Sequence, residues 1–168
     1  MRNENSNPDI EDDRSWRVPL SDDQRARQAW IGVLSMAPSA RLSDLFEAVP
    51  EKPDYEFLRK PESGLIMTQG RIGGAGGAFN MGEMTVTRCS VKLSDGTVGH
   101  AYQAGRDKKK ARCCALLDAM LQQPERRLEI MNSIIEPLKA EQAARDLARA
   151  KKVAATKVDF FTLVRGED

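Results

Sequence analysis

The spacing of hydrophobic residues changes twice along the chain and divides it into three stretches. Between Ser21 and Pro50, apolar residues recur every three or four positions, which is typical of helices. From Asp54 to Ala104 they alternate with polar residues, which is typical of strands. Helical spacing returns over residues 108–155. The pattern predicts an α+β fold in which N-terminal and C-terminal helices pack on an antiparallel sheet.

The N-terminal stretch predicts two helices. Ser21 and Gln24 have the spacing of a capping box, so a helix is expected over 22–35, and Pro38 ends it. A second helix begins at Ser39 or Ser43 and ends before Pro50. The side chains expected to face the core are Ala26, Trp30, Val33, Leu34, Leu42, Leu45, Phe46 and Val49.

The middle stretch predicts four short strands. Their expected ranges are 55–60, 64–71, 84–93 and 97–104, and Ser94-Asp95-Gly96 has the composition of a hairpin turn. Because the links between them are short, the sequence predicts a four-stranded antiparallel meander.

The C-terminal stretch predicts three helices. Asp107 is placed to cap a helix over 108–122, Pro124 separates it from a helix through Ile135, and Pro137 starts another that runs to about Ala155. The apolar face of the last helix is narrow, so burial alone would hold it weakly against the body.

The two ends of the chain differ from the middle. Residues 1–20 are polar and acidic, and we expect a disordered tail there, with residues 21–168 forming a single domain. The C-terminal segment is apolar, and it either completes the sheet or binds a partner. The residues predicted to bind a partner are Val158, Asp159, Phe160, Phe161, Val164 and Arg165.

Composition excludes several classes of protein. The 168 residues carry a net charge of +1, which gives no overall field to attract nucleic acid or an anionic membrane. The sequence contains no apolar run long enough to cross a bilayer and no secretory signal, so a cytoplasmic location is expected. Its three cysteines, an odd number, predict buried apolar thiols rather than disulfides or a metal site.

The stretch RIGGAGGAFNMGEM, residues 71–84, contains five glycines. A phosphate-binding loop needs a helix after its glycines, whereas an alternating, strand-like sequence follows here, without Gly-Lys-Ser/Thr. Three interpretations remain: a hairpin loop that contacts another chain, a loop shaped only by its turn, and an anion-binding loop. The candidates for phosphate or partner contact are Arg71, Gly73, Gly74, Gly76, Gly77, Arg88, Arg106 and Lys108.

Other candidate chemistry is sparse. Residues 106–112 hold five cations at the start of a predicted helix, where they oppose the helix dipole. They form either a solvated helix face or a site for an anion or an acidic surface. His100 is the only histidine, and no nucleophile or acid is placed near it in the sequence. We therefore expect no catalytic residue, no metal site and no cofactor in this chain.

Several motifs, in order and spacing, resemble the PhnG family over about residues 25–168. They are Arg27-Gln28-x-Trp30, the span Gly64-Leu65 to Gly74, Gly76, Phe79, Gly82-Glu83-x-Thr85-x-Thr87-Arg88, Leu93-x-Asp95-Gly96-Thr97-x-Gly99, Gly105-Arg106-Asp107-Lys108, and Val158-Asp159-Phe160-Phe161-Thr162-x-Val164-Arg165-Gly166.

The resemblance implies a subunit of the bacterial carbon–phosphorus lyase system for phosphonate breakdown. PhnG-like subunits join PhnH, PhnI and PhnJ in a core complex. With PhnL, the PhnG, PhnH and PhnI subunits support displacement of adenine from ATP by an alkylphosphonate. The family implies that PhnI carries the nucleosidase chemistry and that PhnJ later cleaves the carbon–phosphorus bond. It implies no catalytic residue for this chain.

Three hypotheses follow. The first is a non-catalytic subunit of the ribose-phosphonate triphosphate synthase. The second is an independent nucleotide- or anion-binding module that uses the glycine-rich hairpin and the basic segment. The third is a small binding module outside this pathway.

Overall fold

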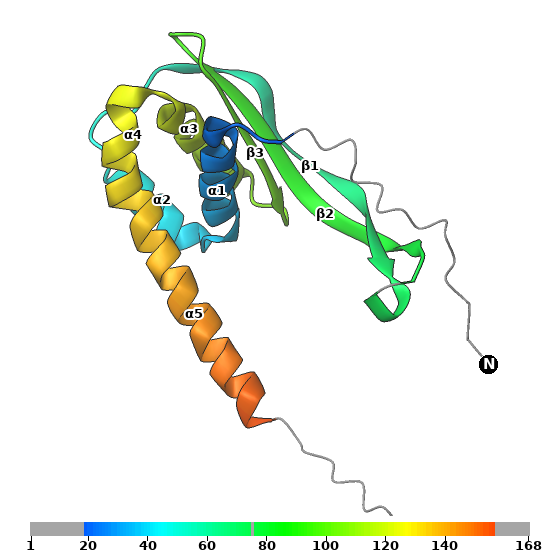
Figure 1. Cartoon of the computed structure of the whole chain (residues 1–168). Coiled ribbons are helices and arrows are strands. Elements are labelled where there is room, and N and C mark those ends of the chain that lie inside the picture. Colours follow the sequence, from blue (N-terminus) through cyan, green and yellow to red (C-terminus); the bar gives the residue numbers. More distant parts are fainter. Residues whose placement is uncertain (1–18, 75, 157–168) are drawn as a thin grey trace, which may run out of the picture.

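The computed structural model describes residues 19–74 and 76–156. Two helices, α1 (Asp22–Met36) and α2 (Ser39–Glu47), precede three strands, β1 (Tyr55–Arg71), β2 (Ala78–Leu93) and β3 (Val98–Ala104). Helices α3 (Lys108–Gln122) and α4 (Pro124–Ile130), the π-helical turn η2 (Met131–Ile135) and α5 (Glu136–Ala155) follow. The predicted α+β class is thereby confirmed (Figure 1).

Among the described residues, the sheet has three antiparallel strands in the order β1-β2-β3, and the four segments predicted as strands form only these three, so the prediction of a four-stranded meander is wrong. The two segments predicted on either side of Pro61 form one strand of 17 residues. Proline is tolerated because β1 lies at the edge of the sheet, and a shift in its register between Arg59 and Glu62 spans Pro61.

β2 also begins earlier than predicted, at Ala78 rather than Met84. The connection between β1 and β2 is therefore short and includes the 3-10 turn η1 (Ile72–Gly74). Because β3 reaches only as far as Val86 along β2, the outer parts of β1 and β2 form a two-stranded ribbon. We call residues 64–71 and 78–85 the β arm; Figure 1 shows it extending to the lower right, away from the helices.

Several local predictions are confirmed. Ser21 and Gln24 form the capping box of α1, and the Asp107 side chain accepts the Lys110 backbone N–H at the start of α3. The last two predicted helices are continuous in the structure, although Pro137 cannot donate a backbone hydrogen bond. The π-helical turn η2 lies directly before it and accommodates the missing bond.

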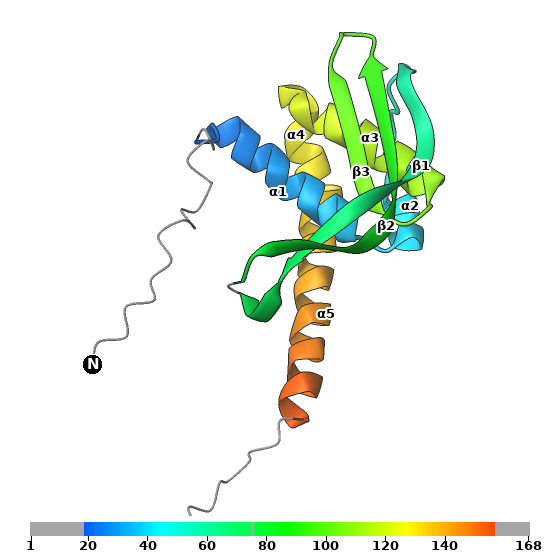
Figure 2. The ribbon, with the colours of Figure 1, turned by 90° about the vertical axis from the view of Figure 1, so that its right-hand side faces the viewer.

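Helix α3 lies at the centre of the core. It packs between the sheet and the other helices and buries ten residues (Figures 1 and 2). Gly99 allows β3 to approach it closely, because a Cβ at this position would lie 2.0 Å from the Ala115 carbonyl oxygen. None of the described helices is both long and apolar enough to cross a membrane.

Candidate functional site

The β arm carries the glycine-rich turn at its tip, as the sequence predicted for a connection between two strands. The Gly76 N–H donates to the Ile72 carbonyl at 2.9 Å, and Gly73 has a φ of 60°, which favours glycine. The Arg71 guanidinium is exposed and donates to the Gly76 carbonyl at 3.4 Å. The tip therefore gathers the candidates Arg71, Gly73, Gly74, Gly76 and Gly77, a set that we call the tip group.

The remaining candidate cations lie elsewhere. Arg88 is on the outer face of the sheet and forms an ion pair with Glu62 at 2.8 Å. Glu62 pairs with Arg88 across β1 and β2, and Arg71 lies nine residues further along β1. At 3.3 Å per residue, Arg71 and Arg88 are separated by about 30 Å. They do not form one anion site.

Arg106 and Lys108 lie on either side of Asp107, the N-cap of α3, just after the C-terminal end of β3. Both are exposed, whereas Lys110 of the same basic segment turns inward and donates to the Ser35 carbonyl at 2.6 Å. Burial lowers the pKa of Lys110. The basic segment is therefore divided between exposed cations and one lysine that joins α3 to α1.

The β arm exposes many large apolar side chains. The exposed fractions are 61% for Leu65, 54% for Met67 and 66% for Met81, and Phe79 and Met84 are also exposed. Ile72, in the turn at the tip of the arm, is 73% exposed. A two-stranded ribbon of this kind is only marginally stable in water without cover. Exposed apolar groups gathered on one projecting element are typical of an interaction surface.

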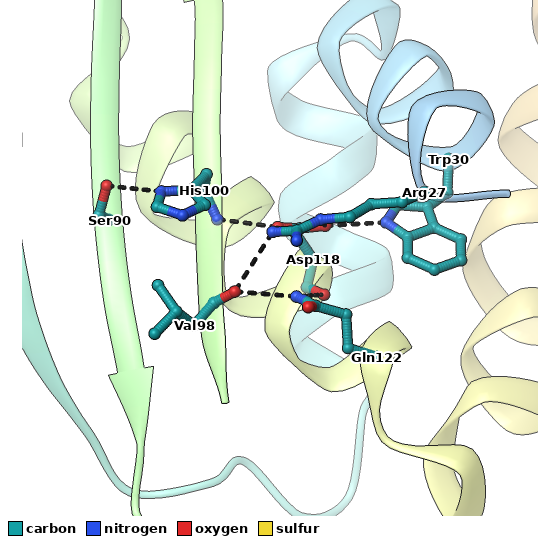
Figure 3. A network of polar contacts seen from close by, with 7 residues as sticks. All are labelled: Arg27, Trp30, Ser90, Val98, His100, Asp118 and Gln122. Carbon is teal, nitrogen blue, oxygen red and sulfur yellow. Dashed lines mark hydrogen bonds and ion pairs between the residues drawn. The ribbon is translucent and has the colours of Figure 1, made fainter. Parts of the chain in front are cut away.

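A buried polar network joins α1, β3 and α3, and sequence reasoning missed its central residue. Asp118 is fully buried and accepts hydrogen bonds from Arg27, from the Trp30 indole N–H at 2.9 Å and from the His100 backbone N–H at 2.8 Å (Figure 3). The sequence signal was a single carboxylate inside the apolar run CALLDAML, residues 114–121. A buried carboxylate is stable only when it is paired in this way.

The same network reaches the backbone of β3. Arg27 and Gln122 both donate to the Val98 carbonyl, at 3.2 and 2.9 Å (Figure 3). Because Asp118 and Arg27 are engaged with each other and with the main chain, the network holds elements together rather than presenting a reactive group.

His100 projects from the opposite face of the sheet to the core. Its Nδ1 lies 2.9 Å from the Ser90 hydroxyl, and its side chain is exposed (Figure 3). Ser90 and His100 face each other across β2 and β3. No carboxylate is hydrogen-bonded to the His100 ring among the described residues, so the pair lacks the third group of a catalytic triad.

The cysteines behave as the sequence predicted, as buried thiols without disulfides. Burial raises the pKa of Cys89 to about 11 and that of Cys114 to about 12, and it also raises the pKa of Cys113. Within residues 19–74 and 76–156, no group of three His, Cys, Asp or Glu residues could hold a metal ion. The candidate partner-binding residues Val158, Asp159, Phe160, Phe161, Val164 and Arg165 lie outside the described residues.

Two comparisons extend the observations to known proteins. A family model described as "Phosphonate metabolism protein PhnG" matches residues 25–166. The chain is also 43% identical over 142 residues to the "Alpha-D-ribose 1-methylphosphonate 5-triphosphate synthase subunit PhnG" of Rhizobium meliloti (strain 1021). That alignment covers 84% of this chain and 90% of the relative.

Proposed function

The chain belongs to the PhnG family of phosphonate metabolism proteins, and from this membership we propose that it is a subunit of an α-D-ribose 1-methylphosphonate 5-triphosphate synthase. The observation that carries the proposal is the 43% identity to a subunit of that synthase across 90% of the relative's length. The family resemblance recognised in the sequence is confirmed. The match supports a multi-subunit role, and it gives no support to an independent nucleotide-binding module.

The reaction of such a synthase follows from its product. A phosphonate oxygen of the alkylphosphonate forms a bond to C1 of the ATP ribose, and the bond from C1 to the adenine nitrogen breaks. The electron pair of that bond leaves with adenine, which takes up a proton, while the triphosphate at C5 is retained. The complex must therefore hold a triphosphate, a ribose and a phosphonate together in a fixed geometry.

We assign this chain a supporting rather than a catalytic role in that reaction. Asp118, which is fully buried, is engaged by Arg27, Trp30 and the backbone of β3. The nucleosidase chemistry would lie in PhnI, and PhnH, PhnJ and PhnL would be the other partners. The subunit would act by positioning its neighbours.

The β arm supports this assignment, because its exposed side chains need cover. An obligate subunit leaves apolar surface of this kind for its partners. The tip group would contact a neighbouring subunit or a triphosphate held mainly by that subunit, with Arg71 providing the charge. Arg88 is already paired with Glu62, so Arg106 and Lys108 are better placed to add a second contact. Residues 158–165 would extend the interface.

Reconstitution tests the proposal. PhnH, PhnI and PhnL from the same genome are mixed with ATP and methylphosphonate, with or without this chain, and adenine release is measured by chromatography. We expect adenine release to depend on this chain and the chain to co-purify with PhnI. Equal adenine release in its absence would overturn the proposal. Calorimetric titration of the isolated chain with millimolar ATP should give no heat, because the triphosphate is held mainly by a neighbour.

A further inference from the structure

The outer edge of β1 in the β arm carries backbone groups whose direction can be read from the ladder. The Gly105 N–H donates to the Thr85 carbonyl at 2.9 Å, so the backbone groups of Thr85 point away from β1. In an antiparallel pair, directly opposed residues either bond to each other or both point outward. Leu65 lies opposite Thr85, so its N–H and C=O point to the outer edge, and those of Ser63 and Met67 follow by alternation.

The outward groups of this edge are uncovered in the described part of the chain. Within residues 19–74 and 76–156, the backbone of residues 63–70 has no hydrogen-bond partner other than β2. The side chains beside it are open as well, since Leu65 is 61% exposed and Met67 is 54% exposed. Because the arm projects clear of the helices (Figure 1), another strand has room to lie along this edge.

The same edge lacks the features that protect strands from pairing with another chain, which are charge, proline and bulges. Residues 63–70 read SGLIMTQG and contain neither a charged residue nor a proline. The register shift between Thr68 and Gln69 arises on the other strand, where Met81 is the extra residue. The edge of β1 is therefore regular and unprotected over these residues.

The other edges of the sheet are protected. Side chains of α1 and α3 cap Val98 and His100 on β3, and beside Tyr102 this strand faces α1 across a hollow of only about 10 Å³. The part of β2 that extends beyond β3 carries Glu83 and the bulge. Nearer the core, β1 contains Pro61 and shifts its register twice. Residues 63–70 are thus the edge best suited to accept a strand.

We propose that this edge pairs with the same edge of a second copy of the chain, antiparallel and about a two-fold axis at Ile66. The inference goes beyond the proposed function, because it concerns contact between two copies of this chain. In this register Leu65 lies opposite the partner's Met67, and the two Ile66 side chains meet on the axis. Apolar residues therefore face each other on both sides of the new ladder.

Self-complementarity is the reason to assign a second copy as the occupant. An isologous pair needs only one edge, and between Ser63 and Gly70 it brings no like charges together. It also converts two ribbons, each marginal alone, into one sheet of four strands in the order β2-β1-β1-β2. Because the strands are antiparallel, the two glycine-rich tips lie at opposite ends and stay free to contact other subunits.

Disulfide cross-linking of the full chain tests the pairing. Ile66→Cys places one cysteine beside the axis, where the Cα atoms of the two copies are about 4.5 Å apart, within the range of a disulfide. The three native cysteines are buried. The matched control is Met84→Cys, which is exposed and opposite Ile66 on β2. Its two copies lie three strand spacings apart, about 14 Å.

We expect oxidised glutathione to give a disulfide-linked dimer with Ile66→Cys and none with Met84→Cys. No dimer from the Ile66 variant, or equal yields from the two variants, would overturn the proposal.

Charge exchange gives a second measurement that does not depend on disulfide geometry. One variant carries Leu65→Lys with Met67→Lys, and the other carries Leu65→Glu with Met67→Glu. Alone, each opposes like charges across the axis, and we expect its dimer dissociation constant in sedimentation experiments to rise at least about tenfold. Mixed, the two variants oppose Lys to Glu at every such position and should form the heterodimer.

The heterodimer also shows that both charged variants are folded. The same charges at the exposed residues Leu147 and Val153 of α5 are the control and should leave the dissociation constant unchanged. A mixture that pairs no better than either variant alone would overturn the pairing.

The reconstituted reaction separates this inference from the proposed function. If Ile66→Cys gives the dimer but the unmodified chain supports no adenine release, the proposed function is overturned and the pairing stands. If adenine release depends on the chain while no dimer forms, only the pairing is overturned. If the Glu variant also loses retention on immobilised PhnI in that case, the edge receives a strand of PhnI instead.

Discussion

Arg27 and Asp118 lie 91 positions apart in the sequence and form an ion pair of 2.6 Å in which the carboxylate is fully buried. The pair joins the first helix to the central helix of the core, and through the Val98 carbonyl and the His100 N–H it also fixes β3. Its effect on the fold is therefore larger than that of a surface ion pair.

Replacing the buried carboxylate should strongly destabilise the protein. We expect Asp118→Ala to lower the free energy of unfolding by about 3–5 kcal/mol, because Arg27, Trp30 and the His100 N–H lose their acceptor. Urea denaturation measures the effect, and Asp146→Ala on the exposed part of α5 is the matched control with a change under about 0.5 kcal/mol. A loss below 1 kcal/mol in the Asp118 variant would contradict the role given to the network.

The contact between β3 and α3 predicts a size limit at Gly99. A Cβ there would lie 2.7 Å from the Ala119 backbone nitrogen, so Gly99→Ala must separate the strand from the helix. We expect a loss of about 1–3 kcal/mol in thermal or urea unfolding. Gly32→Ala in α1 meets nothing within 4 Å and should instead stabilise by up to about 1 kcal/mol. Equal effects in the two variants would contradict the close approach.

The cap of α3 predicts a pH dependence. Hydrogen bonds from the Lys110 backbone N–H and the Ser39 hydroxyl lower the pKa of Asp107 below its usual 3.8. Because the folded-state pKa is depressed, the stabilisation is complete above pH 3.8 and is lost as the pH falls through the folded-state pKa. Asp107→Ala should cost about 1 kcal/mol at pH 6, and this difference should shrink below about pH 4.

Unfolding curves at several pH values measure this difference. Asp107→Asn retains a capping oxygen without the charge, so its stability relative to the alanine variant should vary little with pH. If Asp107→Ala lowers the free energy of unfolding by the same amount down to pH 2, the ionised carboxylate is not the source of the stabilisation.

The tip of the β arm predicts an effect on assembly with little effect on folding. A Cβ at Gly76 would lie 2.7 Å from the Ile72 carbonyl oxygen, whereas one at Gly77 meets nothing within 4 Å. We expect Gly76→Ala to reduce retention on immobilised PhnI several-fold more than Gly77→Ala, while both variants melt near the temperature of the unmodified chain. Identical retention would show that the shape of the tip does not matter for that contact.

The sequence alone determined most of the local structure and the family. Capping residues at Ser21 and Asp107 and the spacing of apolar positions predicted the helices, because these signals act within a few residues of each other. The glycine run was likewise recognised as a connection between strands from a local signal. The alternating sequence directly after it predicts a strand rather than a helix.

Only the tertiary structure decided how distant residues combine. The sequence predicted two strands over 55–60 and 64–71, yet they form one edge strand in which a shifted register accommodates Pro61. Asp118 gave no local sign of its partners Arg27 and Trp30, since a buried charge is defined by what packs around it. Likewise, Arg71 and Arg88 both flank the glycine run in sequence, but the long register of β1 and β2 separates them. Nearby residues therefore determine where helices and strands form. Which distant side chains meet is determined by the register of the paired strands and by burial in the core.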